Sequence, residues 1–472
     1  MRFLKLNFEN GMSIMNYQEC IDYILSIPLF AEKLGTDNLN KILDLMDHPE
    51  RSYRVIHVAG TNGKGSTCAY LASILRQKGF RVGMFTSPHL IRLNERIRVN
   101  NVMIDDASLV DCFNEVSGYV DLAKKKGISH PSFFEFVFLM GVLYFRKQKI
   151  DYAIIETGMG GRLDATNVVL PSVCIITSVG MDHMQYLGDT LAEIAAEKAG
   201  IIKPGIPVVF FDRKDEATHV IGEICKINGG ILHIVEKKQY KLLKITKKSI
   251  DFSFESDYYR YDNLKINNMA LYQIENAILA IRAYELLTCD FKSYNYNENN
   301  NNYNIDIDAI RKGILEMEWP GRMQKIDDRI YVDGAHNEEA IIAFCHTLEM
   351  MFPYEHKVLL FAVSKDKDYT SMIKLLSRIR FEKILIVRYH GDRSADIETV
   401  KNTFLDAYEN IMNDCSHNSI FGLSESSIIT FEDMKTGFEY GKQYINETHV
   451  EDRILFCVGS LYLVGELLSL GV

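Results

Sequence analysis

The chain has 472 residues and a formal net charge of -10, and 47% of its residues are hydrophobic and 25% charged. This length is too great for one ordinary hydrophobic core and predicts two domains, and the composition is that of a soluble globular protein. The negative charge spreads along the chain and argues against a general nucleic-acid binder, although a local basic pocket for an anionic substrate remains compatible with it.

Short apolar runs alternate with helical segments in the first half of the chain. Residues 65–79 carry alanines and leucines at helical spacing and end in a glycine, as a capped helix does. The apolar runs resemble strands buried in a parallel sheet, and their alternation with helices predicts a doubly wound α/β sheet of the P-loop type. These runs are YRVIHVAG (53–60), RVGMFTS (81–87), KIDYAIIETG (149–158), SVCIITSVG (172–180) and PVVFF (207–211).

The sequence changes character between Leu232 and about Tyr261, where apolar and polar residues alternate and the turns are polar. This pattern predicts antiparallel strands in a small sheet attached to the first domain. A helix is expected next, within residues 267–287. Residues 295–304 form an asparagine-rich run with no apolar face, which predicts an exposed and mobile insertion.

A second series of apolar runs begins around Trp319, and helical stretches separate its members. This series predicts a second, Rossmann-like α/β domain. We therefore divide the chain into domains of residues 1–318 and 319–472. The runs are RIYVDGAHN (329–337), KVLLFAVSKDKD (357–368), EKILIVRY (382–389), SSIITFED (426–433) and DRILFCVGS (452–460).

Cysteines and apolar segments indicate the compartment. None of the nine cysteines forms a CxxC pair, and several, such as Cys174 and Cys457, lie inside apolar runs, which predicts buried free thiols in a reducing compartment. The first 15 residues have no apolar stretch typical of a signal peptide, and the longest apolar segments are too short or too interrupted to span a bilayer. We expect a cytoplasmic protein without a membrane segment.

The most specific motif is IHVAGTNGKGST, residues 56–67. Its glycines let backbone N–H groups close around phosphate oxygens, and the helix predicted to begin at Ser66 adds the positive end of its dipole. Lys64 can neutralise the outer phosphates, and Ser66 or Thr67 can offer a hydroxyl to Mg²⁺ or phosphate. The motif departs from GxxxxGK[ST], because Val58 replaces a glycine and Gly65 follows the lysine. A glycine-rich turn without a ligand is the alternative, and the loop alone does not exclude kinases and GTPases.

Three polar residues follow predicted parallel strands, namely Ser87, Glu156 and His183. The carboxyl ends of such strands share one edge of the sheet, where ligands bind. A hydroxyl, a carboxylate and an imidazole can together hold Mg²⁺ there, although the imidazole is an unusual ligand for a cation that prefers oxygen. Taken singly, each is explained equally well as a turn serine, a surface glutamate and a structural histidine.

A glycine-rich turn at 158–161 precedes Leu163, Asp164 and Ala165, and such turns let the backbone approach a ligand. Asp164 can instead cap a helix. Aromatic rings next to Ser132 can stack on a flat heterocycle, although core packing explains them equally well. The sequence DGAHN at 333–337 is a strand-to-helix turn that a helix cap also explains, and most of the charged turn at 365–368 is expected to be solvated.

The loop GTNGKGS resembles the nucleotide loop of the Mur ligase superfamily, and specifically that of the folylpolyglutamate and dihydrofolate synthases. Nine further motifs follow in family order, so the resemblance extends from about residue 20 to the end. They are TSPHLIRLNERIRVN (86–100), SFFEF (132–136), ETGMGGRLDATN (156–167), TSVGMDHMQYLG (177–188), EKAGIIKPG (197–205), ENAILA (275–280), PGRMQ (320–324), DGAHN (333–337) and GSLYLVGE (459–466).

The resemblance implies an ATP- and Mg²⁺-dependent ligase that joins the carboxylate of dihydropteroate or a folate to the amine of L-glutamate through an acyl phosphate. Residues 1–318 would bind ATP and the pteroate or folate, and residues 319–472 would form the glutamate-ligase domain. The protein is expected to act as a monomer, with no nucleic acid and no membrane as partner.

The resemblance also implies the roles of individual residues. The nucleotide contacts would be Gly60, Thr61, Asn62, Gly63, Lys64, Gly65, Ser66, Thr67, Asn276, Arg322 and Asp333. The metal ligands would be Ser87, Glu156 and His183. The substrate contacts would be Ser132, Leu163, Asp164 and Ala165 for the pteroate, and His336 and Ser460 for glutamate. The catalytic group would comprise Lys64, Lys198, His183, Asp164, Asp333 and His336, and the lysine that matches Lys198 is carbamylated in the family, which converts a cation into a carboxylate.

Three functions are considered. The favoured function is that of a bifunctional enzyme, which would add glutamate to dihydropteroate and then lengthen the glutamate tail. The alternative is a monofunctional folylpolyglutamate synthase, which would perform only the second reaction. A regulatory P-loop NTPase without ligase chemistry is the third, and the TSPHL, DATN and DGAHN motifs argue against it. A cell-wall Mur ligase is disfavoured because such enzymes carry an additional N-terminal domain, and only about 50 residues precede the loop here.

Overall fold

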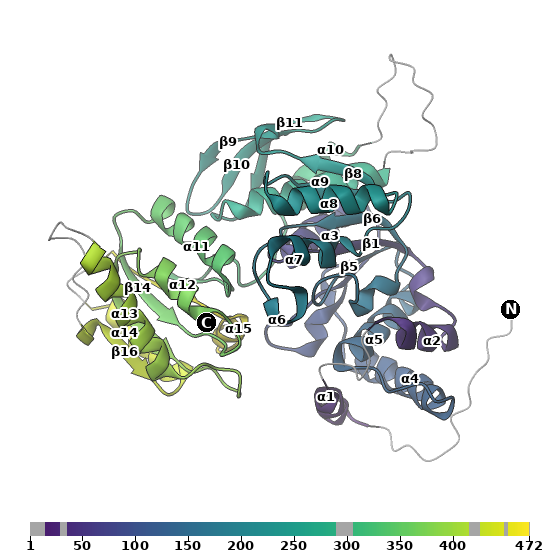
Figure 1. Ribbon diagram of the computed structural model, residues 1–472, viewed down its shortest axis with the longest axis horizontal. Helices are drawn as coiled ribbons and strands as arrows, with labels where there is room; N and C mark the ends of the chain where they lie inside the picture. Colours follow the sequence, from purple (N-terminus) through teal and green to yellow (C-terminus); the bar gives the residue numbers. More distant parts are fainter. Residues whose placement is uncertain (1–14, 29–34, 289–304, 415–424, 448–451, 472) are drawn as a thin grey trace.

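The computed structural model describes residues 15–28, 35–288, 305–414, 425–447 and 452–471, and the predicted insertion at 295–304 lies outside them. Two lobes lie side by side, a large lobe coloured purple to teal and a small lobe coloured green to yellow (Figure 1). Each is an α/β lobe built on its own sheet, which confirms the predicted fold class. The chain position at which one lobe gives way to the other stays a prediction.

An eight-stranded sheet with the order β4-β3-β2-β5-β1-β6-β7-β8 forms the centre of the large lobe. The strands from β2 to β8 in this order are parallel, and β3 and β4 add an antiparallel edge. The strands are β1 (Arg54–Ala59), β2 (Val82–Phe85), β3 (Ile97–Val99), β4 (Val102–Met103), β5 (Tyr152–Glu156), β6 (Pro171–Ile176), β7 (Pro207–Phe211) and β8 (Ile231–Val235).

Helices cover both faces of this sheet, which is why its strands are apolar throughout. Three of them, α3, α9 and α10, pack on one face, whereas α4 and α5 and then α7 and α8 pack on the other. The helices are α1 (Tyr17–Ser26), α2 (Asp37–Leu45), α3 (Lys64–Gln77), α4 (Asp106–Lys125), α5 (Phe133–Lys147), α6 (Met184–Leu187), α7 (Leu191–Ala199), α8 (Glu216–Ile227), α9 (Tyr272–Thr288) and α10 (Ile307–Leu315). Short 3-10 helices are η1 (Pro49–Arg51), η2 (Leu93–Arg96), η3 (Ala165–Val168) and η4 (Lys237–Gln239).

The antiparallel sheet differs from the prediction at its first strand. Residues near Leu232 belong to β8, which pairs in parallel with β7 and extends the large sheet. The separate sheet contains β9 (Tyr240–Ile245), β10 (Ile250–Glu255) and β11 (Arg260–Ile266). Its apolar face packs on the same core as α9. Alternating polarity does not distinguish these two cases, because β8 lies at a sheet edge and is itself half exposed.

The small lobe contains a six-stranded sheet with the order β12-β13-β17-β14-β15-β16, in which β12 alone is antiparallel to its neighbour. One face packs against α11, α12 and α13, and the other against α14 and α15. The strands are β12 (Gln324–Asp327), β13 (Ile330–Val332), β14 (His356–Phe361), β15 (Phe381–Val387), β16 (Ile428–Phe431) and β17 (Arg453–Val458). The helices are α11 (Glu338–Met351), α12 (Tyr369–Leu376), α13 (Ile397–Asp414), α14 (Met434–Ile445) and α15 (Leu461–Ser469), with the 3-10 helix η6 (Glu425–Ser427).

Across the described ranges, every helix is too short or too polar to cross a lipid bilayer.

The close packing of α10 on α3 gives a stability prediction. A Cβ added at Gly313 would lie 2.6 Å from the Cα and 2.7 Å from the backbone nitrogen of Ile74. Because backbone atoms cannot move aside, we expect Gly313→Ala to lower the free energy of unfolding by about 1–3 kcal/mol in urea titrations.

Gly222→Ala is the matched control, because Gly222 also lies inside a helix but its added Cβ would have no neighbour closer than 4.0 Å. We expect this variant to be more stable by about 0.5–1 kcal/mol. Equal effects of the two substitutions would contradict the packing argument.

Candidate active site

A cavity of about 1360 Å³ lies where the two lobes meet. Its wall combines the carboxyl ends of β1, β5 and β6 with the DGAHN turn of the small lobe. The predicted site residues that line it are Gly60, Thr61, Asn62, Gly63, Lys64, Gly65, Ser66, Ser87, Ser132, Glu156, Leu163, Asp164, Ala165, His183, Lys198, Asn276, Arg322, Asp333, His336 and Ser460. Thr67 is the exception, because its side chain is fully buried beneath the loop.

Two neighbouring side chains lie close against the phosphate loop. A Cβ at Gly60 would lie 1.9 Å from the Thr177 hydroxyl, and one at Gly63 would lie 2.3 Å from the Asn276 carboxamide oxygen. Gly63 also has a left-handed φ of 83° and caps α3, which therefore begins at Lys64 and not, as predicted, at Ser66. The first N–H groups of α3 have no partner within the helix, so this end of the loop is suited to bind an anion.

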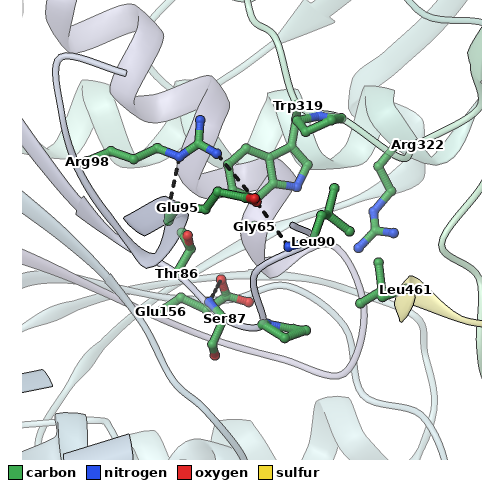
Figure 2. A pocket seen from close by; sticks show the side chains of 12 residues that line it. Gly65, Thr86, Ser87, Leu90, Glu95, Arg98, Glu156, Trp319, Arg322 and Leu461 are labelled. Carbon is green, nitrogen blue, oxygen red and sulfur yellow. Dashed lines mark hydrogen bonds and ion pairs between the residues drawn. The ribbon is translucent and has the colours of Figure 1, made fainter. Parts of the chain in front are cut away.

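Lys64 and Glu156 are two charged groups in this part of the cavity. The Lys64 Nζ donates to the carbonyl oxygens of Gly60 (2.9 Å) and Thr61 (3.1 Å), so the ammonium lies over its own loop. Glu156 ends β5, and its Oε2 accepts the Ser87 backbone N–H at 3.1 Å (Figure 2). Burial raises the pKa of Glu156 to about 7, against the opposing effect of the Lys64 charge. A carboxylate held in this way gains from a cation.

A small cavity of about 40 Å³ adjoins Ser87 and Glu156 (Figure 2). The ring of Trp319 lines this small cavity, and the guanidinium of Arg98 lies 5.5 Å from the centre of that ring. Arg322 reaches the same space from the start of the small lobe. The two lobes therefore share the space immediately next to the predicted metal ligands.

The donor set fits a divalent cation. Glu156 offers a carboxylate, Ser87 a hydroxyl and His183 an imidazole, and all three line the large cavity. Burial lowers the pKa of His183 to about 4, so its ring is neutral and able to bind a metal. Within the described ranges, no three His, Cys, Asp or Glu side chains come together closely enough to hold a metal alone. Phosphate oxygens and water would complete the coordination of Mg²⁺.

The loop that follows β5 is fixed by Asp164. Its Oδ2 accepts the Met159 N–H at 2.9 Å, and its Oδ1 accepts the N–H and the hydroxyl of Thr166 at 3.0 and 2.5 Å. Both carboxylate oxygens are therefore engaged: Oδ1 caps η3, which is the alternative that the sequence left open, and Oδ2 holds the preceding turn through Met159. Leu163, at the tip of the loop, is partly exposed to the cavity. Ser132 likewise caps α5 and pairs with Glu135 at 2.8 Å.

The loop at 158–167 is also held by a histidine that the sequence motifs did not indicate. His57 is buried in β1, and its Nε2 lies 2.8 Å from the Thr166 hydroxyl oxygen. The hydroxyl hydrogen is directed to Asp164, so the oxygen accepts the Nε2 hydrogen of His57. Burial lowers the pKa of His57 to about 3, which keeps the ring neutral. A histidine inside the apolar run IHVAG was the sequence signal.

Lys198 lies on α7 and is 3% exposed. The described part of the chain supplies neither a hydrogen bond nor an ion pair to its ammonium group. Burial and then the positive charge of Lys64 lower the pKa of Lys198 to about 7. A large fraction of this amine is therefore neutral near neutral pH, and a neutral amine is the form that reacts with CO₂.

Polar residues from both lobes form an interlobe network of Asn62, Ser178, Asp182, Asn337, Glu339 and Lys367. The side-chain amides of Asn62 and Asn337 exchange hydrogen bonds at 3.1 and 3.0 Å. Asn62 also donates to Glu339 at 2.8 Å, and Lys367 donates to Asp182 at 2.6 Å. The expected solvation of the turn 365–368 does not extend to Lys367, whose side chain is 11% exposed.

The DGAHN turn contributes two engaged side chains. Asp333 accepts the Tyr272 hydroxyl and the Met323 and Ala335 N–H groups, each at 2.8 Å. His336 Nδ1 lies 2.8 Å from the Gly334 carbonyl oxygen, so Nδ1 carries the hydrogen and Nε2 keeps its lone pair. Burial lowers the pKa of His336 to about 4. Ser460 caps α15 and accepts the Tyr462 N–H at 3.1 Å.

Protein-family comparisons match one domain in each lobe. Residues 129–284 match the Mur ligase middle domain, and residues 321–458 match the Mur ligase glutamate ligase domain. The chain is 36% identical over 370 residues to the dihydrofolate synthase/folylpolyglutamate synthase of Bacillus subtilis, which covers 77% of this chain and 83% of that one. It is 33% identical over 381 residues to the folylpolyglutamate synthase of Lacticaseibacillus casei, with 80% and 86% covered.

Solved structures show the same fold. The folylpolyglutamate synthase of Thermotoga maritima superimposes with a TM-score of 0.77 at 28% identity, covering 97% of each chain. The Mycobacterium tuberculosis folylpolyglutamate synthase complexed with ADP superimposes with a TM-score of 0.83 at 24% identity, covering 96% of this chain and 98% of that one.

The buried amine of Lys198 gives the first prediction from this site. We expect it to add CO₂ reversibly, forming an N–C bond and releasing one proton. In ¹³C-bicarbonate the wild-type protein should show a carbamate NMR signal that grows as the pH rises through about 7, because the neutral amine accumulates. Lys203→Met, a control on the neighbouring loop, should keep the signal, and Lys198→Met should lose it. A signal that persists in the second variant would contradict the assignment.

The ion pair between Lys367 and Asp182 gives a second prediction from this site. Burial acts to raise the pKa of Asp182, but the ammonium of Lys367 holds it below its usual value. We expect Lys367→Met to lower the free energy of unfolding by about 3 kcal/mol, because it leaves a mostly buried charge unpaired. The difference should shrink as the pH falls and Asp182 becomes protonated.

Lys365→Met is the control, since Lys365 lies exposed in the same turn. Urea unfolding at neutral and acidic pH measures both variants. An equal loss in the two would show that the buried pair has no special weight.

Proposed function

This chain belongs to the folylpolyglutamate synthase/dihydrofolate synthase family of Mur ligases, and on this premise we propose that it ligates L-glutamate to both dihydropteroate and reduced folates. It is an ATP-dependent ligase that forms a C–N bond. The observation that carries the proposal is the single cavity, which brings the phosphate loop, the candidate metal ligands, the loop at 158–167 and the DGAHN turn to one space.

The reaction needs activation, because the oxygen of a carboxylate is a poor leaving group. The carboxylate of the acid attacks the γ-phosphorus of ATP, and the bond to ADP breaks. The glutamate amine then attacks the acyl carbon of the resulting acyl phosphate, loses a proton and expels inorganic phosphate. Bound at Ser87, Glu156 and His183, Mg²⁺ would supply charge neutralisation during phosphoryl transfer.

The residues of the chain position the reactants. Lys64 and the first N–H groups of α3 stabilise the charge that develops on the transferred phosphoryl group. Asn276, which packs on Gly63, and Arg322, which enters from the small lobe, are placed to bind the nucleotide. The loop with Leu163 and Ala165 forms the wall for the pteroate ring system. His336 directs the lone pair of Nε2 away from its own backbone, so this atom is available to the incoming glutamate.

Closure between the lobes protects the intermediate. The interlobe network and the bond between Tyr272 and Asp333 hold the small lobe against the phosphate loop. Water is thereby kept from the acyl phosphate, which it would otherwise hydrolyse.

The proposal extends to assembly and location. The cavity is built from one chain, which supports action as a monomer. The seven described cysteines are free thiols, and six of them are buried, which supports a reducing compartment such as the cytoplasm.

The substrate assay decides between the two ligase functions. Purified protein is given ATP, Mg²⁺ and labelled glutamate, with dihydropteroate or tetrahydrofolate in separate reactions. We expect incorporation with both acids. Incorporation with tetrahydrofolate alone would favour the monofunctional enzyme. The two relatives differ on this point, since the Bacillus subtilis enzyme is a dihydrofolate synthase/folylpolyglutamate synthase and the Lacticaseibacillus casei enzyme is a folylpolyglutamate synthase. Incorporation with neither acid would refute the ligase function.

Lys64, which begins α3, and Lys78, the C-cap of this helix, test the phosphate loop in the same assay. Lys64→Ala should lower kcat at least about 100-fold, because it removes a charge aimed at the transferred phosphoryl group. Lys78→Ala is the matched control, since Lys78 ends the same helix and pairs with Asp306 at 3.1 Å. Turnover close to the wild-type rate in Lys64→Ala would show that the loop has another role.

A further inference from the structure

Arg96 is a buried cation whose hydrogen-bonding capacity is largely unused. It ends η2 and lines the large cavity, and it is 8% exposed. Its Nε donates to the His89 Nδ1 at 2.8 Å, and its guanidinium lies 5.1 Å from the centre of the Phe133 ring. Among the residues that the structure describes, neither Nη atom has a hydrogen-bond partner and no carboxylate lies within 4.0 Å of the guanidinium. Four of its five N–H groups therefore lack a protein acceptor.

Such an arrangement is unfavourable in the protein alone. Burial lowers the pKa of Arg96 to about 10, although Tyr462, Glu156 and Glu95 favour the charged form. His89 gives no compensation, because burial and the Arg96 charge lower its pKa to about 4 and keep it neutral. A buried charge without a counter-ion destabilises a fold, and groups of this kind are concentrated at functional sites.

The backbone places Arg96 between two parts of the site. Its carbonyl oxygen accepts the Thr86 N–H at 3.0 Å, which brings η2 next to Ser87 and the candidate metal ligands. Its guanidinium stacks on Phe133, the first residue of α5 and the neighbour of Ser132. Arg96, Ser132 and Glu156 line the same cavity, so an acid bound between Ser132 and Glu156 would have its anionic end within the part of the cavity that Arg96 borders.

We propose that Arg96 binds a carboxylate of the acid substrate through its unpaired Nη groups. This inference rests on the proposed function and assigns to that site the residue that distinguishes an acid from a neutral ligand. The planar fork of a guanidinium matches the two oxygens of a carboxylate and can bind both at once. The carboxylate has two possible sources, the reacting group itself or the α-carboxylate of the terminal glutamate of a folate.

The test measures ligand binding without turnover. Pteroate is compared with its carboxamide, and folate with its α-monoamide, in titrations of the wild-type protein and of Arg96→Gln. For at least one pair, the wild type should bind the acid about 10- to 100-fold more tightly than the amide, the range of a charged hydrogen bond. Arg96→Gln should bind both members of that pair equally, chiefly by losing affinity for the acid.

The outcomes separate the sources and the alternatives. Lost discrimination in the pteroate pair assigns the reacting carboxylate, and loss confined to the folate pair assigns the α-carboxylate. If Arg96→Gln weakens acid and amide equally, Arg96 is only structural and the proposal is overturned. The proposal also fails if the variant loses affinity for ATP while keeping its affinity for both acids, because the anion would then be a phosphate.

Two further variants keep the result interpretable. Arg92→Gln changes an arginine at the start of the same 3-10 helix that pairs with Asp106 at the surface, and it should bind like the wild type. Arg96→Lys keeps the charge but loses the fork, so its discrimination should be intermediate. Circular dichroism verifies that each variant is folded. Wild-type protein that binds the acids but does not ligate glutamate would contradict the proposed function and leave the role of Arg96 intact.

Discussion

The site depends on the close approach of backbone and side chains at the end of β1. This strand lies between β5 and β6, so the phosphate loop begins where Glu156 and Thr177 also leave the sheet. Thr177 and Asn276 then press on loop positions where only glycine fits. The loop is therefore shaped by its surroundings before any ligand binds, and the groups that follow the neighbouring strands are brought to it by the parallel pairing of the sheet.

Burial is the second principle of the site. Glu156, Lys198 and Arg96 are each buried, and among the described residues none of them has an ion-pair partner within 4.0 Å. Each has a pKa displaced toward its neutral form. These groups destabilise the empty protein, whereas a metal, a carbamate or a substrate carboxylate would relieve them. Lys367 and Asp182 show the opposite arrangement, since their charges are already paired across the lobes. The protein thus separates the charges that we propose to bind ligands from the charges that are paired within its structure.

Local sequence carried much of this information. Continuous apolar runs predicted the parallel strands, and the rule that parallel strand ends share an edge predicted that Ser87, Glu156 and His183 would line one space, although their metal-binding role stays a prediction. Local sequence could not predict partners that are distant in the chain, because Lys367 and Asp182 are 185 residues apart. The buried state of Arg96 and the contact of His57 with Thr166 depend in the same way on tertiary packing. The edge strand β8 was misassigned because the alternating pattern begins directly after it, and its own half-exposed residues do not mark where one sheet ends and the other begins.

The exchange of amide hydrogen bonds between Asn62 and Asn337 has a thermodynamic consequence. Asn62 belongs to the phosphate loop and Asn337 caps α11, so one pair of side chains belongs to both the candidate nucleotide site and the contact between the lobes. Free energies of linked equilibria are reciprocal. A nucleotide that binds more tightly to this loop geometry must stabilise the contact between the lobes. By the same free energy, a ligand that stabilises the interlobe contact must raise the affinity for the nucleotide. Order of substrate addition can arise from this linkage without any separate regulatory element.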